Sequence, residues 1–192
     1  MTDPTDEALL LKTREGDRDA FAVLYNRYKP RLFGYCHHLI ADRQIAEDIV
    51  QTTFLKAFKA LSTLDNPSLF YYWLFSIARN EIFTILRQKR TEGGTLPIDE
   101  VDEIGDPDSP HEKFVREETR EVVQRCLGQL KVEYRELLVL RQFEKLSYAE
   151  IAAITGDTLS AVESRLFKAR RALAKKLAPY LEAGENHRGR NI

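Results

Sequence analysis

The segment 147–173 constrains the fold most, because it combines a helix start with a helix stop inside one short stretch. Ser147 and Glu150 have the spacing of a capping box, in which each side chain bonds the backbone amide of the other residue. Gly156 follows a short apolar-periodic run and suits the positive φ that ends a helix. A second run follows at once. The segment therefore predicts a helix-turn-helix, whose second helix enters the major groove of DNA.

The second predicted helix begins at another pair with capping-box spacing, Ser160 and Glu163. Cations dominate its later part, where positions 165–176 hold no acid and the following basic residues: Arg165, Lys168, Arg170, Arg171, Lys175 and Lys176. Contacts to DNA phosphates need such cations. A solvated amphipathic helix would carry a similar charge run, so the interpretation depends on the turn and the caps together.

The rest of the chain predicts an all-α protein made of two small helical domains joined by a flexible acidic linker. Apolar residues recur at helical spacing in several segments, and Asp42 is placed to cap a helix over 42–61. The segment 91–112 has no such period and contains three glycines, three prolines and eight acids. The expected divisions are a first domain over 1–90, a linker over 91–112, a second domain over 113–182, and a disordered tail over 183–192.

The net charge of −1 conceals a strong asymmetry along the chain. Residues 1–90 hold 13 Lys and Arg against 11 acids, residues 91–118 hold 2 against 10, and residues 119–192 hold 14 against 9. Two mildly basic blocks thus flank an acidic connector. Two distant cysteines form no disulfide framework, and neither a signal peptide nor a membrane span is recognisable. We expect a cytoplasmic protein with no membrane insertion.

An enzyme or a metal protein is an alternative that would use the sequence Cys36-His37-His38 together with Asp48. Three consecutive residues on a helix point about 100° apart, so they cannot converge on one ion. A structural zinc site needs four convergent ligands. No nucleophile is paired with a base, and no glycine-rich phosphate loop is present. We therefore expect no catalytic residues, no metal and no cofactor.

The predicted helix over 70–90 carries a second stripe beside its apolar one, at steps of three and four: Tyr72, Ser76, Arg79, Phe83, Arg87 and Arg90. Aromatic rings stack on unpaired bases and arginines hold the backbone, which is the composition expected for single-stranded nucleic acid. The rim of an ordinary core would use the same residue types, and spacing alone does not decide between these two interpretations.

Taken together, these segments resemble an extracytoplasmic-function sigma factor, a two-domain bacterial transcription initiation factor. The resemblance covers about residues 7–178. In the first half it depends on AEDIVQTTFLKAFKAL (46–61), FYYWLFSIARN (70–80) and RQKR (87–90). In the second half it depends on RELLVLRQFEKLSYAEIA (135–152) and AVESRLFKARRAL (161–173). A helix-turn-helix is shared with many regulators, whereas this order of motifs around an acidic linker is far more specific.

The resemblance implies partners and roles for individual residues. Binding to core RNA polymerase is implied, at the clamp coiled coil of its largest subunit and at its flap. The clamp contact is implied for residues on the exposed side of the first domain: Asp48, Gln51, Thr52, Leu55 and Lys56. Contact with the single-stranded −10 promoter element is implied for Asn66, Phe70, Tyr71, Tyr72, Trp73, Arg79, Asn80 and Arg87. Contact with the duplex −35 element is implied for Ser160, Glu163, Ser164, Arg165, Phe167, Lys168 and Arg171.

The resemblance also implies an anti-sigma factor, which would hold the protein inactive and can tether it at the membrane. Glu163 departs from the family pattern, since this recognition-helix position is often basic. A glutamate accepts a hydrogen bond from the amino group of cytosine, so the −35 preference is expected to differ. The competing hypothesis is a stand-alone helix-turn-helix regulator, which would bind duplex DNA tightly without polymerase and would leave residues 42–90 without a role.

Overall fold

The computed structural model describes residues 3–91 and 121–188, with side chains described as far as Leu181. Across these two ranges the regular secondary structure is entirely helical, which confirms the predicted all-α class. In the N-terminal half (residues 3–91) the elements are α1 Asp6–Arg14, α2 Arg18–Ile40, α3 Arg43–Lys59, the 3-10 turns η1 Leu61–Thr63 and η2 Pro67–Leu69, and α4 Phe70–Thr91. In the C-terminal half (residues 121–188) they are a helix at 121–128, α6 Val132–Gln142, α7 Tyr148–Thr155 and α8 Leu159–Arg188. The predicted linker from position 92 onward lies outside the described residues.

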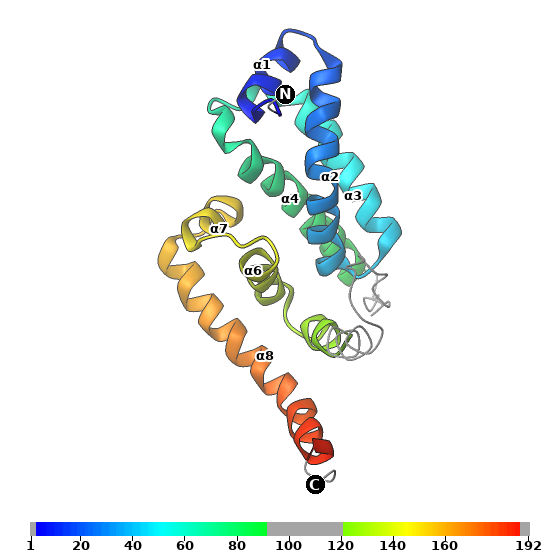
Figure 1. Ribbon diagram of the computed structural model, residues 1–192, viewed down its shortest axis with the longest axis vertical. Helices are drawn as coiled ribbons and strands as arrows, with labels where there is room; N and C mark the ends of the chain where they lie inside the picture. The colour runs from blue at the N-terminus through cyan, green and yellow to red at the C-terminus, as the bar shows by residue number, and fades with distance from the viewer. Residues whose placement is uncertain (1–2, 92–120, 189–192) are drawn as a thin grey trace.

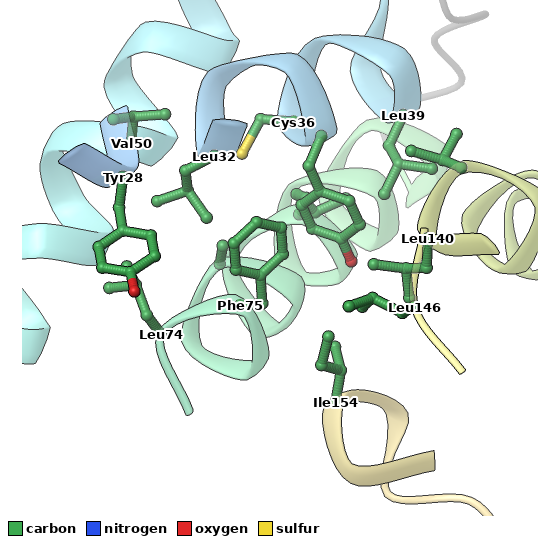
Figure 2. Close-up of a cluster of buried hydrophobic side chains, with 14 of the residues drawn as sticks. Tyr28, Leu32, Cys36, Leu39, Val50, Leu74, Phe75, Leu140, Leu146 and Ile154 are labelled. Carbon is green, nitrogen blue, oxygen red and sulfur yellow. The ribbon is translucent and has the colours of Figure 1, made fainter. Parts of the chain in front are cut away.

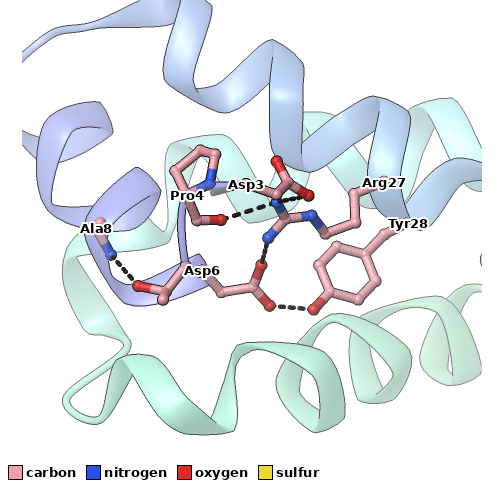
Figure 3. Close-up of polar contacts among 7 residues, drawn as sticks. Asp3, Pro4, Asp6, Ala8, Arg27 and Tyr28 are labelled. Carbon is pink, nitrogen blue, oxygen red and sulfur yellow. Dashed lines mark hydrogen bonds and ion pairs between the residues drawn. The ribbon is translucent and has the colours of Figure 1, made fainter. Parts of the chain in front are cut away.

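The N-terminal half is a helical bundle in which α2, α3 and α4 pack side by side and α1 lies across one end (Figure 1). Asp17 and Asp42 cap α2 and α3, and each side chain accepts from the amide three residues on, at 3.1 and 3.0 Å. The start of α1 is tied to α2 because Asp6 accepts hydrogen bonds from both Arg27 and Tyr28 (Figure 3). These local bonds fix the ends of the bundle that carries α3 and α4.

Pro30 lies inside α2, where an isolated helix would be expected to end or kink at this residue. A proline within a helix removes one backbone hydrogen bond. The flanking residues offset this loss, because Leu24, Tyr28 and Leu32 are all buried on one side of α2. Tertiary packing therefore carries this helix through a residue that would end it in isolation.

The C-terminal half contains the predicted helix-turn-helix, formed by α7 and α8. Both bonds of the Ser147–Glu150 capping box are present, and Gly156 ends α7 with φ +72°. The second predicted cap is wrong: α8 begins at Leu159, and Thr158 rather than Ser160 accepts from an amide, that of Ala161, at 3.2 Å. Ser160 is therefore already inside the helix, because Thr158, which can also act as an N-cap, stands two positions earlier.

The helix α8 continues through Arg188, six residues into the segment that the sequence predicts as a disordered tail from position 183. Pro179 does not end it. Once a helix is nucleated each further residue adds one backbone bond, so a long packed helix can extend past its last tertiary contact. Residues 189–192 lie outside the described ranges.

The two halves share one hydrophobic core. Figure 2 shows Leu140, Leu146 and Ile154 of the C-terminal half projecting toward Phe75 of α4, and all four side chains are buried. Figure 1 shows α7 beside α4, and the contacts agree with this view, since α7 contacts α4 while α6 contacts α2. The C-terminal half thus covers one face of α4, which the sequence does not predict.

Candidate nucleic-acid interface

The first turns of α8 separate cleanly into a buried side and an exposed side. Val162, Leu166 and Ala169 are buried against the rest of the C-terminal half. The remaining side holds the residues expected to read the −35 element, of which these are exposed: Ser160, Glu163, Ser164, Phe167, Lys168 and Arg171. The helix therefore presents this set together on one free surface.

Two features of this surface were not evident from the sequence. The Phe167 ring is 61% exposed, and the Arg171 guanidinium lies 5.8 Å from its centroid. Arg165 is half-buried and forms an ion pair with Asp157 in the turn, which positions its guanidinium beside the start of α8. Phe167 suits contact with a thymine methyl group, while cations at this helix suit phosphates.

The outward side of α3 holds the five residues expected to bind polymerase. Asp48, Gln51, Leu55 and Lys56 are exposed and Thr52 is half-buried, whereas Ile49 and Val50 on the other side are buried, as are Phe54 and Ala57. Phe58 lies one turn after the buried Phe54 but is itself 41% exposed. An exposed Leu55 and Phe58 give this surface an apolar component that suits a protein partner.

Lys56 is restrained within this surface. Its Nζ lies 2.6 Å from an Oε1 of Glu81 on α4, so it connects the outward side of α3 to the neighbouring helix. An exposed ion pair of this kind contributes little to stability. Its effect is to hold the ammonium group in a defined place beside Leu55.

The residues expected to contact the −10 element divide into three groups. Asn80 and Arg87 are exposed on α4, and Asn66 is exposed before it, where its side chain accepts from the amide of Ser68 at 3.1 Å. Phe70 is 1% exposed and lies in the core, with its ring 6.1 Å from that of the half-buried Trp73. Phe70, which the resemblance assigns to the −10 element, therefore packs in the core.

The third group consists of Tyr71, Tyr72 and Arg79, and all three bond acids of the C-terminal half. The Tyr71 hydroxyl donates to Glu144 at 2.9 Å, and the Tyr72 hydroxyl donates to Glu150 at 2.5 Å. The three acids involved are Glu136, Glu144 and Glu150, which we call the acidic face.

Glu136 makes the most buried contacts of the acidic face. Its carboxylate accepts from Nε of Arg79 at 2.8 Å and from the hydroxyl of Tyr35 at 2.9 Å, and its side chain is 2% exposed. Burial raises the pKa of Glu136, while Arg79 and Tyr35 act in the opposite direction and Asp157 adds a smaller raising effect. Burial and the neighbouring Glu136 also raise the pKa of Tyr35.

Glu144 and Glu150 lie nearer the rim of the contact. Arg31 of α2 pairs with Glu144 at 2.9 Å, and its guanidinium lies 4.8 Å from the centre of the Tyr71 ring. The hydrogen bond from Tyr72 lowers the pKa of Glu150 and raises that of Tyr72. Each donor that α4 offers here thus faces a carboxylate.

Sequence reasoning missed the acidic face and one further residue, Arg135. The Arg135 side chain is buried and donates to the carbonyls of Leu127, Gly128 and Leu130, and to that of Leu39 at the end of α2. Burial lowers the pKa of Arg135. The sequence signal that could have indicated these buried contacts was the pair Arg135-Glu136, which stands immediately before an unbroken apolar run. Charged residues at such a position need buried partners.

The segment Cys36-His37-His38 does not form a cluster of ligands. Cys36 is buried in the core, and the ring of His38 packs 4.2 Å from that of Phe143 and bonds Gln124. Within 3–91 and 121–188, no group of three His, Cys, Asp or Glu side chains is arranged to hold a metal ion. In the same ranges no helix is both long and apolar enough to cross a bilayer.

Comparison with known proteins identifies both halves. Residues 24–92 match the family described as Sigma-70 region 2, and residues 120–173 match Sigma-70, region 4. The chain is 32% identical over 189 residues to the RNA polymerase sigma-H factor of Pseudomonas aeruginosa, covering 94% of this chain and 98% of that protein. It is 31% identical over 188 residues to the ECF RNA polymerase sigma-E factor of Escherichia coli K12, covering 92% and 96%.

A solved structure gives the same assignment. The sigma factor RpoE of Bartonella quintana, crystallised in complex with the anti-sigma factor NepR, matches this chain with a TM-score of 0.63. The two chains are 26% identical, and the match covers 78% of this chain and 91% of that one.

Proposed function

The chain belongs to the extracytoplasmic-function group of the sigma-70 family, whose members direct transcription initiation without being enzymes, and we propose how its surfaces divide that task. Residues 1–90 act as region 2 and residues 113–182 as region 4, with the acidic segment 91–112 between them. The polymerase supplies all of the chemistry. The chain supplies promoter selection and strand separation.

Region 4 reads the duplex −35 element through α8. Lys168 and Arg171 contact phosphates, and Phe167 and Glu163 face base edges. A glutamate accepts from the cytosine amino group, so Glu163 gives a preference that differs from that of relatives with a basic residue there. The support for this role is the exposure of the whole set on one side of α8.

Region 2 binds core polymerase through α3 and the melted −10 element through α4. The clamp coiled coil meets Asp48, Gln51 and Leu55, and the exposed edge of α4 meets the separated strand. Unstacking a base costs a few kcal/mol, which stacking and hydrogen bonds to Tyr72, Trp73 and their neighbours offset. A second contact, between region 4 and the polymerase flap, sets the distance between the two promoter elements.

An anti-sigma factor is the expected regulator, and where it is membrane-bound it would hold this otherwise cytoplasmic protein at the membrane. The structural relative from Bartonella quintana is bound to such a protein. The stand-alone regulator is the weaker hypothesis, because it gives no role to the exposed side of α3.

One observation carries the proposal: a helix-turn-helix with a free reading surface lies in the same chain as a separate exposed surface on α3. Lys168→Ala should reduce transcription from a promoter with its −35 element and leave the affinity for core polymerase unchanged. Lys131→Ala is the matched control, since Lys131 is an exposed lysine of the same half that lies at the start of α6, outside α8. Asp48→Ala combined with Gln51→Ala should do the reverse. Loss of core binding in Lys168→Ala would contradict the division of roles.

A further inference from the structure

We propose that the free protein is autoinhibited, because the acidic face (Glu136, Glu144 and Glu150) occupies the groups of α4 that would otherwise hold the −10 strand. This inference rests on the proposed role of α4 in binding single-stranded DNA. It identifies region 4 as an internal competitor of that strand. The packed arrangement must open before Tyr71, Tyr72 and Arg79 can contact DNA.

The competition is chemical as well as steric. A carboxylate accepts the same charge-assisted hydrogen bonds from Arg79 and from the tyrosine hydroxyls that a phosphate oxygen would accept. Three acids on one face also place negative charge where a nucleic-acid backbone would run, and like charges repel. The ring of Tyr71 is already in contact, 4.4 Å from Phe75 and under the guanidinium of Arg31.

The contact between the two halves is suited to opening. Replacing a buried ion pair by apolar residues is often neutral or stabilising, so the pair between Arg79 and Glu136 adds specificity rather than a large free energy. The remaining contribution comes from apolar side chains, among them Leu140, Leu146 and Ile154, and from hydrogen bonds between the halves such as that from Arg135 to the carbonyl of Leu39. A larger interface with core polymerase can therefore displace it.

Separation of the two halves leaves the helix-turn-helix of α7 and α8 folded. Glu150 uses its Oε1 to accept from Tyr72 at 2.5 Å and its Oε2 to accept from the backbone amide of Ser147 at 2.7 Å. The capping box of α7 therefore persists when the tyrosine leaves, and α7 and α8 keep their own contacts. The acidic face can release α4 while the helix-turn-helix stays folded.

The test uses the full chain with Glu144→Gln and Glu150→Gln together. Both substitutions keep the shape of the side chain, and glutamine is compatible with a capping box. Glu136 is left in place because its burial would make a folding defect hard to separate from opening. The matched control is Glu121→Gln with Glu133→Gln, two exposed acids of the same half that change the net charge equally.

Two measurements are made on each protein. Spin labels at Lys59→Cys and Lys175→Cys, both exposed positions, report the distance between the halves by pulsed electron resonance, since the native Cys36 and Cys126 are buried. Anisotropy of a fluorescein-labelled 12-nucleotide single-stranded DNA of degenerate sequence reports strand binding.

We expect the double variant to lower the closed-to-open ratio about tenfold and to strengthen single-strand binding by a similar factor, because two hydrogen bonds to charged groups become bonds to neutral ones. An unchanged distance distribution would overturn the proposal. So would an open variant with unchanged strand affinity, or a control pair with an equal gain. Run-off transcription by the wild type with core polymerase tests the proposed function separately: its absence would refute that function whatever the distances show.

Discussion

Truncation of Leu55 tests the polymerase-binding surface, because the loss of binding affinity can be calculated from the exposed fraction of this side chain. The side chain is 56% exposed in the free protein. Fully burying a leucine side chain contributes about 1.5–3 kcal/mol, so covering the exposed 56% contributes about 0.8–1.7 kcal/mol. Leu55→Ala should therefore weaken binding to core polymerase roughly 4- to 17-fold. Folding should change little, because alanine is the best helix former and the site is exposed.

The matched control for this change is Leu11→Ala. Leu11 lies on α1, outside the proposed surface, and at 59% its exposure nearly equals that of Leu55. Competition of each variant with the labelled wild type for core polymerase gives the two affinities at one salt concentration. Leu55→Ala binding within twofold of wild type would refute the assignment, and an equal loss in Leu11→Ala would show that the effect is not local to α3.

Two further predictions concern buried charges. Arg135→Met leaves several carbonyls without their donor, so it should lower the free energy of unfolding in urea by about 3–5 kcal/mol. Arg125→Met, at an exposed position, should change that free energy by less than about 0.5 kcal/mol. Equal effects of the two substitutions would contradict the role given to Arg135. Burial raises the pKa of Glu136, so its contribution to stability is fully present below 4.5 and is lost as pH rises through the raised pKa. The stability of wild type relative to Glu136→Gln should therefore fall as pH rises above 4.5, and a difference independent of pH would exclude this linkage.

Local signals in the sequence predicted the helix ends well. Asp42, Ser147 and Gly156 each act through bonds or dihedral angles within a few residues, so their roles can be predicted without knowing the tertiary fold. The prediction at Ser160 was wrong for a related reason. Two candidate caps, Thr158 and Ser160, stood within one turn, and the intrinsic preference for serine did not decide between them.

The contact between the halves could not be predicted in the same way. Helical periodicity tells which side of a helix is apolar, but it does not tell which distant helix covers that side. The stripe containing Tyr72 and Arg79 was open to two interpretations for this reason. Its partners, Glu136 and Glu150, lie more than 50 positions away along the chain, beyond an intervening acidic segment.

Run-off transcription on a promoter library tests the central claim most directly. Core polymerase with this protein should select templates that share a −35 and a −10 motif at fixed spacing and should start transcription at one position downstream, whereas core alone should not. The selected −35 motifs should change when Glu163 is replaced by Gln. Transcription with the protein that is no better than with core alone, on every template, would contradict the claim that this chain directs initiation.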